Sequence, residues 1–434
     1  MGCSSSAEAP KPAEVAVSAS NTEKVGKYPT WTVGDIPRAG KVSSAQFSEV
    51  EEALVAWLVA KKVPGASLAI VDAGGRPLMA RAFGVCDLAA AAPLLPTHGV
   101  GFGSIGKSIH AACLLALVDD GLLKLDDTLG GLFGGADTGF DANCDAYATT
   151  VNQCLRHTSG FADDPASLPF VSPYDTAVAM LRKGKRKVVR RGSSRRRTAD
   201  SAFEYCDNIY SVLHLVIGKA LERAGRTDEA ADIPGFIEKR VLAPLGAADD
   251  VIWMGDARMP SMADVGVSAG RLARGYTVAT DKGGATTCTP IAAYDNFGTK
   301  RDWSYGASGY TGTALGLART MQAFGGDRNR GNSKVLKKET IDAAFTVTPP
   351  SECGLNIMPY GATRDGGLMF GHGGSNGAVA VVMPDGGAVA CVVTGTLGLS
   401  GWDTSDHSQL GKVEDVLGFW STAVYPTLTK AYTS

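Results

Sequence analysis

The 434-residue sequence predicts a mixed α/β (α+β) fold in which helices pack against antiparallel strands. Residues 63–71 and 81–87 have the composition of two strands, and a Gly-Gly pair between them favours a tight turn. Residues 379–383 and 389–393 flank an Asp-Gly-Gly turn, which predicts a second antiparallel hairpin. Between these two hairpins in the sequence lies a predicted buried helix, which is the most informative part of the chain.

That helix is expected to begin near Ser104. Residues 109–117 are apolar on most of the helix circumference, and Gly121 is a natural C-terminal cap. Helical residues three apart stand on one face, so the Lys107 ammonium is expected over the Ser104 hydroxyl. A partly desolvated, neutral lysine can take the serine proton there, so the pair predicts a serine nucleophile with a lysine base.

The same segment also matches a different catalytic pattern. Residues 101–108 read Gly-x-x-x-x-Gly-Lys-Ser, the sequence of a phosphate-binding P-loop. A P-loop requires a buried strand directly before it, and two prolines in residues 92–99 argue against one. A magnesium-binding acid on a second strand is also lacking, because Asp119 falls on the same helix as Lys107. An ATPase remains the less favoured alternative.

Further short motifs occur in a consistent order along the chain. They are Val63-Pro64-Gly65, Lys124-Leu125-Asp126-Asp127, Leu155-Arg156-His157-Thr158-Ser159-Gly160, Phe203-Glu204-Tyr205, Val241-Leu242-Ala243-Pro244-Leu245-Gly246 and Phe370-Gly371-His372-Gly373-Gly374. Together with Ser104-x-x-Lys107, this order resembles the serine beta-lactamase and penicillin-binding protein superfamily, in its class C beta-lactamase, D-alanyl-D-alanine peptidase and esterase-like branch. The resemblance covers about residues 45–425. It implies a beta-lactamase/transpeptidase-like antiparallel sheet flanked by helices, with an inserted, mostly helical domain.

The resemblance implies a role for three side chains. Ser104 is expected to be the acylated nucleophile and Lys107 its general-base partner. Tyr205 resembles the motif tyrosine that relays the proton to and from the leaving group. The implied activity is hydrolysis of a small-molecule ester or amide through an acyl-enzyme, without a metal or an organic cofactor.

The third motif of the family corresponds to His372-Gly373-Gly374, a stretch that is His-x-Gly in many esterase-like relatives. The two glycines are expected to let a substrate lie against an edge strand. The backbone N–H groups of Ser104 and Ser375 are then expected to form the oxyanion hole.

One position departs from the family pattern. The second motif is Tyr-x-Asn, and the spacing from Tyr205 to Tyr210 places Asp207 where the asparagine belongs; an insertion that shifts Asn208 into that place is the alternative. An ionised carboxylate only accepts hydrogen bonds, and it holds a neighbouring lysine in its charged form. Asp207 therefore favours ester over amide cleavage, or a catalytically impaired binding or scaffold protein on the same fold.

We expect three parts in the chain. Residues 1–44 contain few large apolar groups and predict a disordered tail. Residues 45–135 and 310–430 are expected to form a discontinuous sheet domain, and residues 136–309 a mostly helical domain with a basic insertion at 182–197. The resemblance places the active site in the crevice between the two domains. The remaining histidines, among them His157, His110 and His214, have no metal-ligand spacing, so we expect a structural role for them.

The N-terminal tail and the basic insertion contain signals for where in the cell the protein resides. Gly2 and Cys3 fit N-myristoylation with an adjacent palmitoylated cysteine, which predicts the cytoplasmic face of a eukaryotic membrane; without acylation, a cytoplasmic protein is expected. Residues 182–197 carry ten Lys or Arg and no acid, which predicts a solvated insertion or a contact with anionic lipid. They contain no aromatic residue, which argues against nucleic acid. The nine cysteines have no paired spacing and predict reduced thiols. The oligomeric state is left open.

Overall fold

The structure, a computed structural model, describes twelve segments of the chain. They are residues 26–42, 45–134, 146–161, 203–207, 209–253, 272–280, 282–290, 309–325, 333–364, 366–374, 377–397 and 418–431.

Within those segments, the largest sheet has eight strands and is antiparallel throughout, with the order β11-β12-β13-β14-β3-β4-β2 and β5 paired to β4. Its strands are β2 (Arg38–Val42), β3 (Gly65–Val71), β4 (Pro77–Asp87), β5 (Ala92–Pro93), β11 (Met358–Ala362), β12 (Leu368–Gly374), β13 (Ala378–Val382) and β14 (Ala388–Val393). The two predicted hairpins are therefore both present. They meet at the centre of the sheet, where β14 pairs with β3.

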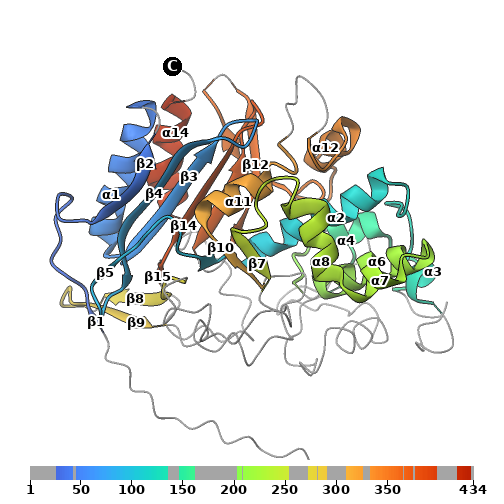
Figure 1. Ribbon diagram of the computed structural model, residues 1–434, viewed down its shortest axis with the longest axis horizontal. Helices are drawn as coiled ribbons and strands as arrows, with labels where there is room; N and C mark the ends of the chain where they lie inside the picture. The colour runs from blue at the N-terminus through green and yellow to red at the C-terminus, as the bar shows by residue number, and fades with distance from the viewer. Residues whose placement is uncertain are drawn as a thin grey trace, which may run out of the picture.

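Each face of this sheet packs against different helices, because side chains alternate along the strands. On β14, Val389 and Cys391 face a core formed with α1 (Ser48–Lys61), η6 (Trp420–Val424) and α14 (Tyr425–Ala431). The intervening residues, Ala388, Ala390 and Val392, belong to the core on the opposite face, against α11 (Ala314–Met321). Figure 1 shows α1 and α14 together on one side of the sheet and α11 on the other.

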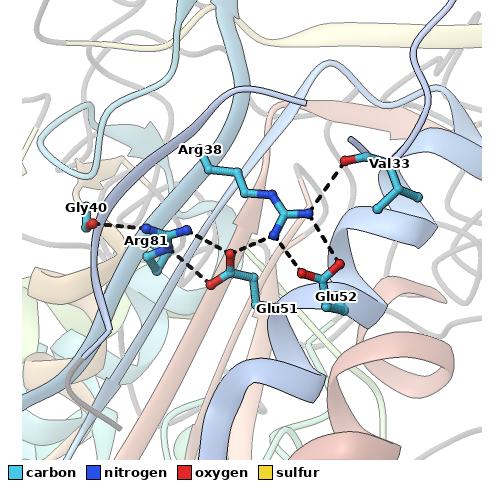
Figure 2. Close-up of polar contacts among 6 residues, drawn as sticks. All are labelled: Val33, Arg38, Gly40, Glu51, Glu52 and Arg81. Atoms are coloured by element: carbon cyan, nitrogen blue, oxygen red, sulfur yellow. Dashed lines mark hydrogen bonds and ion pairs between the residues drawn. The ribbon is translucent and has the colours of Figure 1, made fainter. Parts of the chain in front are cut away.

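The expectation that residues 1–44 form a disordered tail is wrong for residues 26–42, which include the edge strand β2. A charged network holds it in place (Figure 2). The Glu51 carboxylate on α1 accepts hydrogen bonds from Arg38 on β2 at 3.1 Å and from Arg81 on β4 at 2.7 and 3.1 Å. Arg38 also binds Glu52, one residue further along α1, at 2.6 Å. This strand is fixed by ion pairs as well as by pairing with β4, so its composition gave little apolar signal.

A second correction concerns the expected helical domain, residues 136–309. This region contributes three strands to two small sheets. One sheet has the order β1-β9-β8-β15, formed by β1 (Gly26–Lys27), β9 (Thr286–Pro290), β8 (Tyr276–Thr280) and β15 (Gly395–Leu397); the other has the order β6-β10-β7, formed by β6 (Val100–Gly101), β10 (Tyr310–Gly312) and β7 (Val251–Trp253). Tyr276, Val278 and Cys288 form a small core with Tyr28, which explains why strands form here.

The described part of that region also contains helices. Its helices pack around α2 (Gly106–Asp119), the predicted buried helix, which is preceded by the 3-10 turn η2 (Gly103–Ile105) (Figure 1). The remaining helices of the described chain are η1 (Ala45–Phe47), α3 (Leu129–Phe133), α4 (Val151–Leu155), α6 (Ile209–Arg223), α7 (Thr227–Ala231), α8 (Ile233–Ile237), η3 (Glu238–Leu242) and α12 (Lys338–Phe345). Gly121 has a φ of +72° just after α2, so a glycine ends this helix as predicted.

Candidate active site

Ser104 and Lys107 lie where strand β6 of the three-stranded sheet leads through η2 into α2. The N–H of Phe102 donates to the carbonyl of Tyr310 at 2.9 Å, which fixes the chain just before the turn. Gly103 then has a φ of +55°, a conformation that favours glycine, and Ser104 follows inside η2. Lys107 Nζ donates to Ser104 Oγ at 3.0 Å. The predicted approach of the two side chains on one helical face is therefore present.

The Lys107 ammonium is fully buried, and its ionic partner is Asp207. Lys107 Nζ and Asp207 Oδ1 are 2.5 Å apart, with the lysine side chain 0% exposed and the aspartate 44% exposed. Burial by itself lowers the pKa of Lys107, but the charge of Asp207, followed by interactions with Tyr205, outweighs it, so the net pKa is raised. The expected neutral lysine is thus not the resting state, because the carboxylate at the asparagine position holds Lys107 charged.

Tyr205 completes the polar group around the serine. Its ring lies 5.0 Å from Lys107 Nζ. Burial raises the pKa of Tyr205 to about 12, while the charge of Lys107 and hydrogen bonds with Lys107 and Ser104 oppose that rise. A protonated phenol therefore faces both the serine and the lysine at neutral pH. The structure brings the three predicted side chains, Ser104, Lys107 and Tyr205, to one place.

The third motif lies on β12, beside η2. His372 is buried, and its Nδ1 is 2.7 Å from the carbonyl oxygen of Gly373, which assigns the proton to Nδ1. Its Nε2 has no hydrogen-bond partner in the described part of the chain. Burial, and then the charge of Lys107, lower the pKa of His372 to about 4, so the imidazole is neutral. Gly373 and Gly374 end the strand, and Ser375, the expected second oxyanion donor, lies outside the described residues.

His157, expected to be only structural, lies directly behind Tyr205. The two rings are stacked with centroids 4.4 Å apart and an interplanar angle of 21°. Sequence reasoning also missed Asn356, a fully buried residue whose side-chain N–H donates to Ser108 Oγ at 3.2 Å. Both residues are non-glycine residues with positive φ, +54° for His157 and +65° for Asn356. That conformation depends on tertiary contacts, so no local pattern in the sequence pointed to it.

The other two histidines expected to be structural form a buried pair one turn beyond Lys107. Nε2 of His110 on α2 and Nδ1 of His214 on α6 are 3.0 Å apart. Burial lowers the pKa of His110 to about 4 and that of His214 well below its usual value. Both are therefore neutral, and they join the two central helices through a hydrogen bond.

Several predicted features lie outside the described residues: Gly2, Cys3, Asn208 and the basic insertion at 182–197. The expectations about acylation and lipid contact stay predictions. Across the described segments, no helix combines the length and apolar character needed to cross a membrane. The same segments contain no group of three or more His, Cys, Asp or Glu side chains placed to hold a metal ion.

Comparison with known proteins bears on the fold and the family of this chain. No curated protein matches the chain, but solved structures share its fold. The octameric penicillin-binding protein homologue from Pyrococcus abyssi is 22% identical, with a TM-score of 0.58 over 80% of this chain and 73% of that one. The D-amino acid amidase from Ochrobactrum anthropi SV3 is 20% identical, with a TM-score of 0.61 over 90% and 98% of the two chains. A family VIII carboxylesterase is 16% identical, with a TM-score of 0.60 over 83% and 94%.

At these identities the structural likeness shows the fold, and it is the beta-lactamase/transpeptidase-like fold that the motifs predicted. The family is shown separately, by a match of the Beta-lactamase family profile to residues 47–408. That match spans most of the 434 residues and includes Ser104, Tyr205 and His372. The chain belongs to the Beta-lactamase family.

Proposed function

We propose that this protein is a serine hydrolase that cleaves an ester or amide through an acyl-enzyme on Ser104. The observation that carries the proposal is the 3.0 Å hydrogen bond from Lys107 Nζ to Ser104 Oγ, with the centroid of the Tyr205 ring 5.0 Å from the same Nζ. A nucleophile within hydrogen-bond reach of a proton acceptor that is itself oriented by a third group is the arrangement that activates a serine.

In the proposed reaction, Ser104 Oγ forms a bond to the substrate carbonyl carbon and gives up its proton. Lys107 is charged and Tyr205 is protonated at rest, so the proton acceptor is this coupled pair after it has lost one proton. The same pair returns the proton to the leaving group as the carbonyl re-forms and the bond to that group breaks. A water molecule then attacks the acyl carbon and gives a proton to the same pair. The bond between that carbon and Ser104 Oγ breaks as the pair returns the proton to Oγ, which releases the acid and restores Ser104.

Asp207 makes esters the preferred substrates in this proposal. The leaving alkoxide or phenoxide of an ester needs less help from a proton donor than the nitrogen of an amide. The ion pair of 2.5 Å holds Lys107 charged and leaves little of the base form, so the bond that is easier to break is favoured. The solved structures that share this fold include both an amidase and a carboxylesterase, and Asp207 favours the esterase side.

The test is labelling by a fluorophosphonate probe, followed by intact mass, and turnover of p-nitrophenyl acetate. We expect one probe adduct on the natural protein and neither adduct nor turnover in Ser104→Ala, because no other group replaces the lost hydroxyl. Ser48→Ala, an exposed serine at the start of α1, is the matched control and should label normally. Undiminished turnover in Ser104→Ala would contradict the proposal.

Asp207 also supports a second candidate function, a catalytically impaired binding or scaffold protein. In that case the natural protein should neither label nor turn over ester, while Asp207→Asn should gain both. The ATPase alternative is not supported, because the buried ammonium of Lys107 contacts Ser104 and Asp207 and cannot reach a phosphate without breaking both contacts. Thermal stabilisation by Mg-ATP would revive it.

A further inference from the structure

His157 occupies a backbone position that normally belongs to glycine. It follows helix α4, where the N–H of His157 donates to the carbonyl of Cys154 at 3.2 Å and the N–H of Thr158 to that of Gln153 at 2.9 Å. These two bonds are the Schellman motif that ends a helix, and its left-handed residue is usually glycine. A left-handed residue with a Cβ costs on the order of 1 kcal/mol. The cap alone gives no reason for a histidine, so the reason lies in its side chain.

The side chain and carbonyl of His157 hold the chain on both sides of Tyr205. The N–H of Glu204 donates to the His157 carbonyl at 2.8 Å, and the N–H of Cys206 donates to His157 Nδ1 at 3.1 Å. Between these two bonds the imidazole stacks on the Tyr205 ring at 4.4 Å. One residue thus fixes the backbone before Tyr205, the backbone after it, and the plane of its ring.

The imidazole is suited to this role because it stays neutral. Nδ1 accepts the Cys206 N–H, so the ring proton belongs on Nε2. Burial, and then the charge of Lys107, lower the pKa of His157 to about 3, while the charge of Asp207 opposes that fall. The imidazole is therefore neutral at neutral pH, and Nδ1 stays available to accept the Cys206 N–H.

We propose that His157 is a positioning residue that sets the place and orientation of the Tyr205 phenol against Ser104 and Lys107. The inference rests on the proposed function for its catalytic consequence, but the positioning itself is a structural property. His157 does not touch the reacting atoms, and it acts through Tyr205 alone.

Two substitutions isolate the side chain from the backbone. His157→Gly keeps the left-handed cap, relieves its strain and deletes the ring. His157→Asn also tolerates the left-handed conformation and retains an oxygen close to the place of Nδ1, so it keeps an acceptor for Cys206 but loses the stacked ring. His98→Asn is the matched control, because the buried His98 also accepts a backbone N–H through Nδ1, from Leu95 at 3.1 Å.

The first measurement does not depend on activity. In protein labelled with 3-fluorotyrosine, the ¹⁹F signal of Tyr205 is identified by its loss in Tyr205→Phe. We expect this signal to shift and broaden in His157→Gly, to shift with less broadening in His157→Asn, and to stay in place in His98→Asn. An unmoved Tyr205 signal in folded His157→Gly would overturn the inference, whatever the enzyme does.

The second measurement is a double-mutant cycle on kcat/KM for p-nitrophenyl acetate. Misplacing a catalytic group by about 1 Å can cost about 100-fold, so we expect His157→Gly to lower kcat/KM by about that factor, mainly through kcat, with partial recovery in His157→Asn. In the Tyr205→Phe background the same substitution should change kcat/KM by no more than about twofold. Equal losses in both backgrounds would show a general structural role and overturn the inference. Absence of turnover in the natural protein together with a moved ¹⁹F signal would instead reject the proposed function and retain the positioning.

Discussion

Two buried ionic groups in this molecule are built differently. In the network between α1, β2 and β4, the Glu51 carboxylate is 9% exposed and lies between the guanidinium groups of Arg38 and Arg81 (Figure 2). In the candidate site, the Lys107 ammonium is 0% exposed and its carboxylate partner, Asp207, is 44% exposed. The first group encloses an anion between two cations. The second encloses a cation and leaves its anion half in solvent.

The difference separates a structural ion pair from one that can take part in chemistry. Around Glu51, two guanidinium groups donate hydrogen bonds to one carboxylate, so the network joins a helix to two strands. Around Lys107, part of the hydrogen-bonding capacity is directed at Ser104 and Tyr205. Removing a charge should therefore affect stability in the first case and acylation in the second.

The largest expected effect is on acylation in Lys107→Met. This variant removes the partner of Ser104 while keeping a long apolar side chain, so the buried position stays filled. General acid–base groups contribute up to about 10⁴-fold, and we expect a loss of that order in the rate of fluorophosphonate labelling. Because a buried charge is replaced by an apolar group, the denaturation midpoint should fall little or rise. A collapse of stability with labelling retained would reverse the comparison.

The next largest expected effect is a loss of stability in the network around Glu51. Glu51→Ala leaves the guanidinium of Arg81, 17% exposed, without its carboxylate partner, and we expect the free energy of unfolding to fall by about 3 kcal/mol. Glu52→Ala is the matched control on the same helix and with the same Arg38; Glu52 is 57% exposed, so its loss should be below about 1 kcal/mol. Urea denaturation of both variants measures this, and labelling of the folded proteins should be unchanged. Similar losses in the two variants would show that enclosure does not set the strength of the network.

The buried pair His110 and His214 sharpens the comparison, because burial lowers the pKa of both side chains and keeps them neutral. The pKa of His110 is about 4 when folded and about 6.5 when unfolded, so below pH 6.5 the unfolded state binds a proton that the folded state does not. Stability present above pH 6.5 is therefore lost as the pH falls, and the loss levels off below about pH 4. Between pH 6.5 and 5 we expect His110 to account for about 2 kcal/mol. Urea titrations of His110→Gln at both pH values should show a smaller loss than the natural protein, and an equal loss would contradict the assignment.

The smallest expected effect concerns Asp207, the partly exposed partner of Lys107. Asp207→Asn removes the charge that raises the pKa of Lys107, so the base form should become available at lower pH. We expect the rising limb of kcat/KM against pH to move to lower pH, with about a tenfold gain in turnover of an amide relative to an ester, since a donor is also restored. Asp120→Asn, at a surface ion pair with Arg240, is the control and should leave the profile unchanged. A limb that stays in place would show that Asp207 does not control the base.

The sequence predicted those parts of the fold that have local patterns. The two hairpins, the buried helix and the approach of Lys107 to Ser104 all follow from periodicity and spacing, and the ordered motifs predicted the family. Edge strand β2 was missed because ion pairs to α1 help to fix it, and those pairs join residues of two different elements, which no pattern within the strand shows. His157 was predicted to be an ordinary structural residue because its contact with Tyr205 joins residues that lie far apart in the sequence.

The pairing of β14 with β3 also has a consequence for how the protein is made. Residues 65–71 leave the ribosome more than 300 residues before their partner, residues 388–393, yet every residue of β3 is buried in the finished sheet. Until then, the growing chain carries an apolar strand with an open edge, which is the feature most prone to pair with another chain. Ser104 and Lys107 are synthesised early, but β12 and the neighbouring hairpin come last. We therefore expect this chain to acquire its site late in synthesis, and to depend on protection of β3 against aggregation until that point.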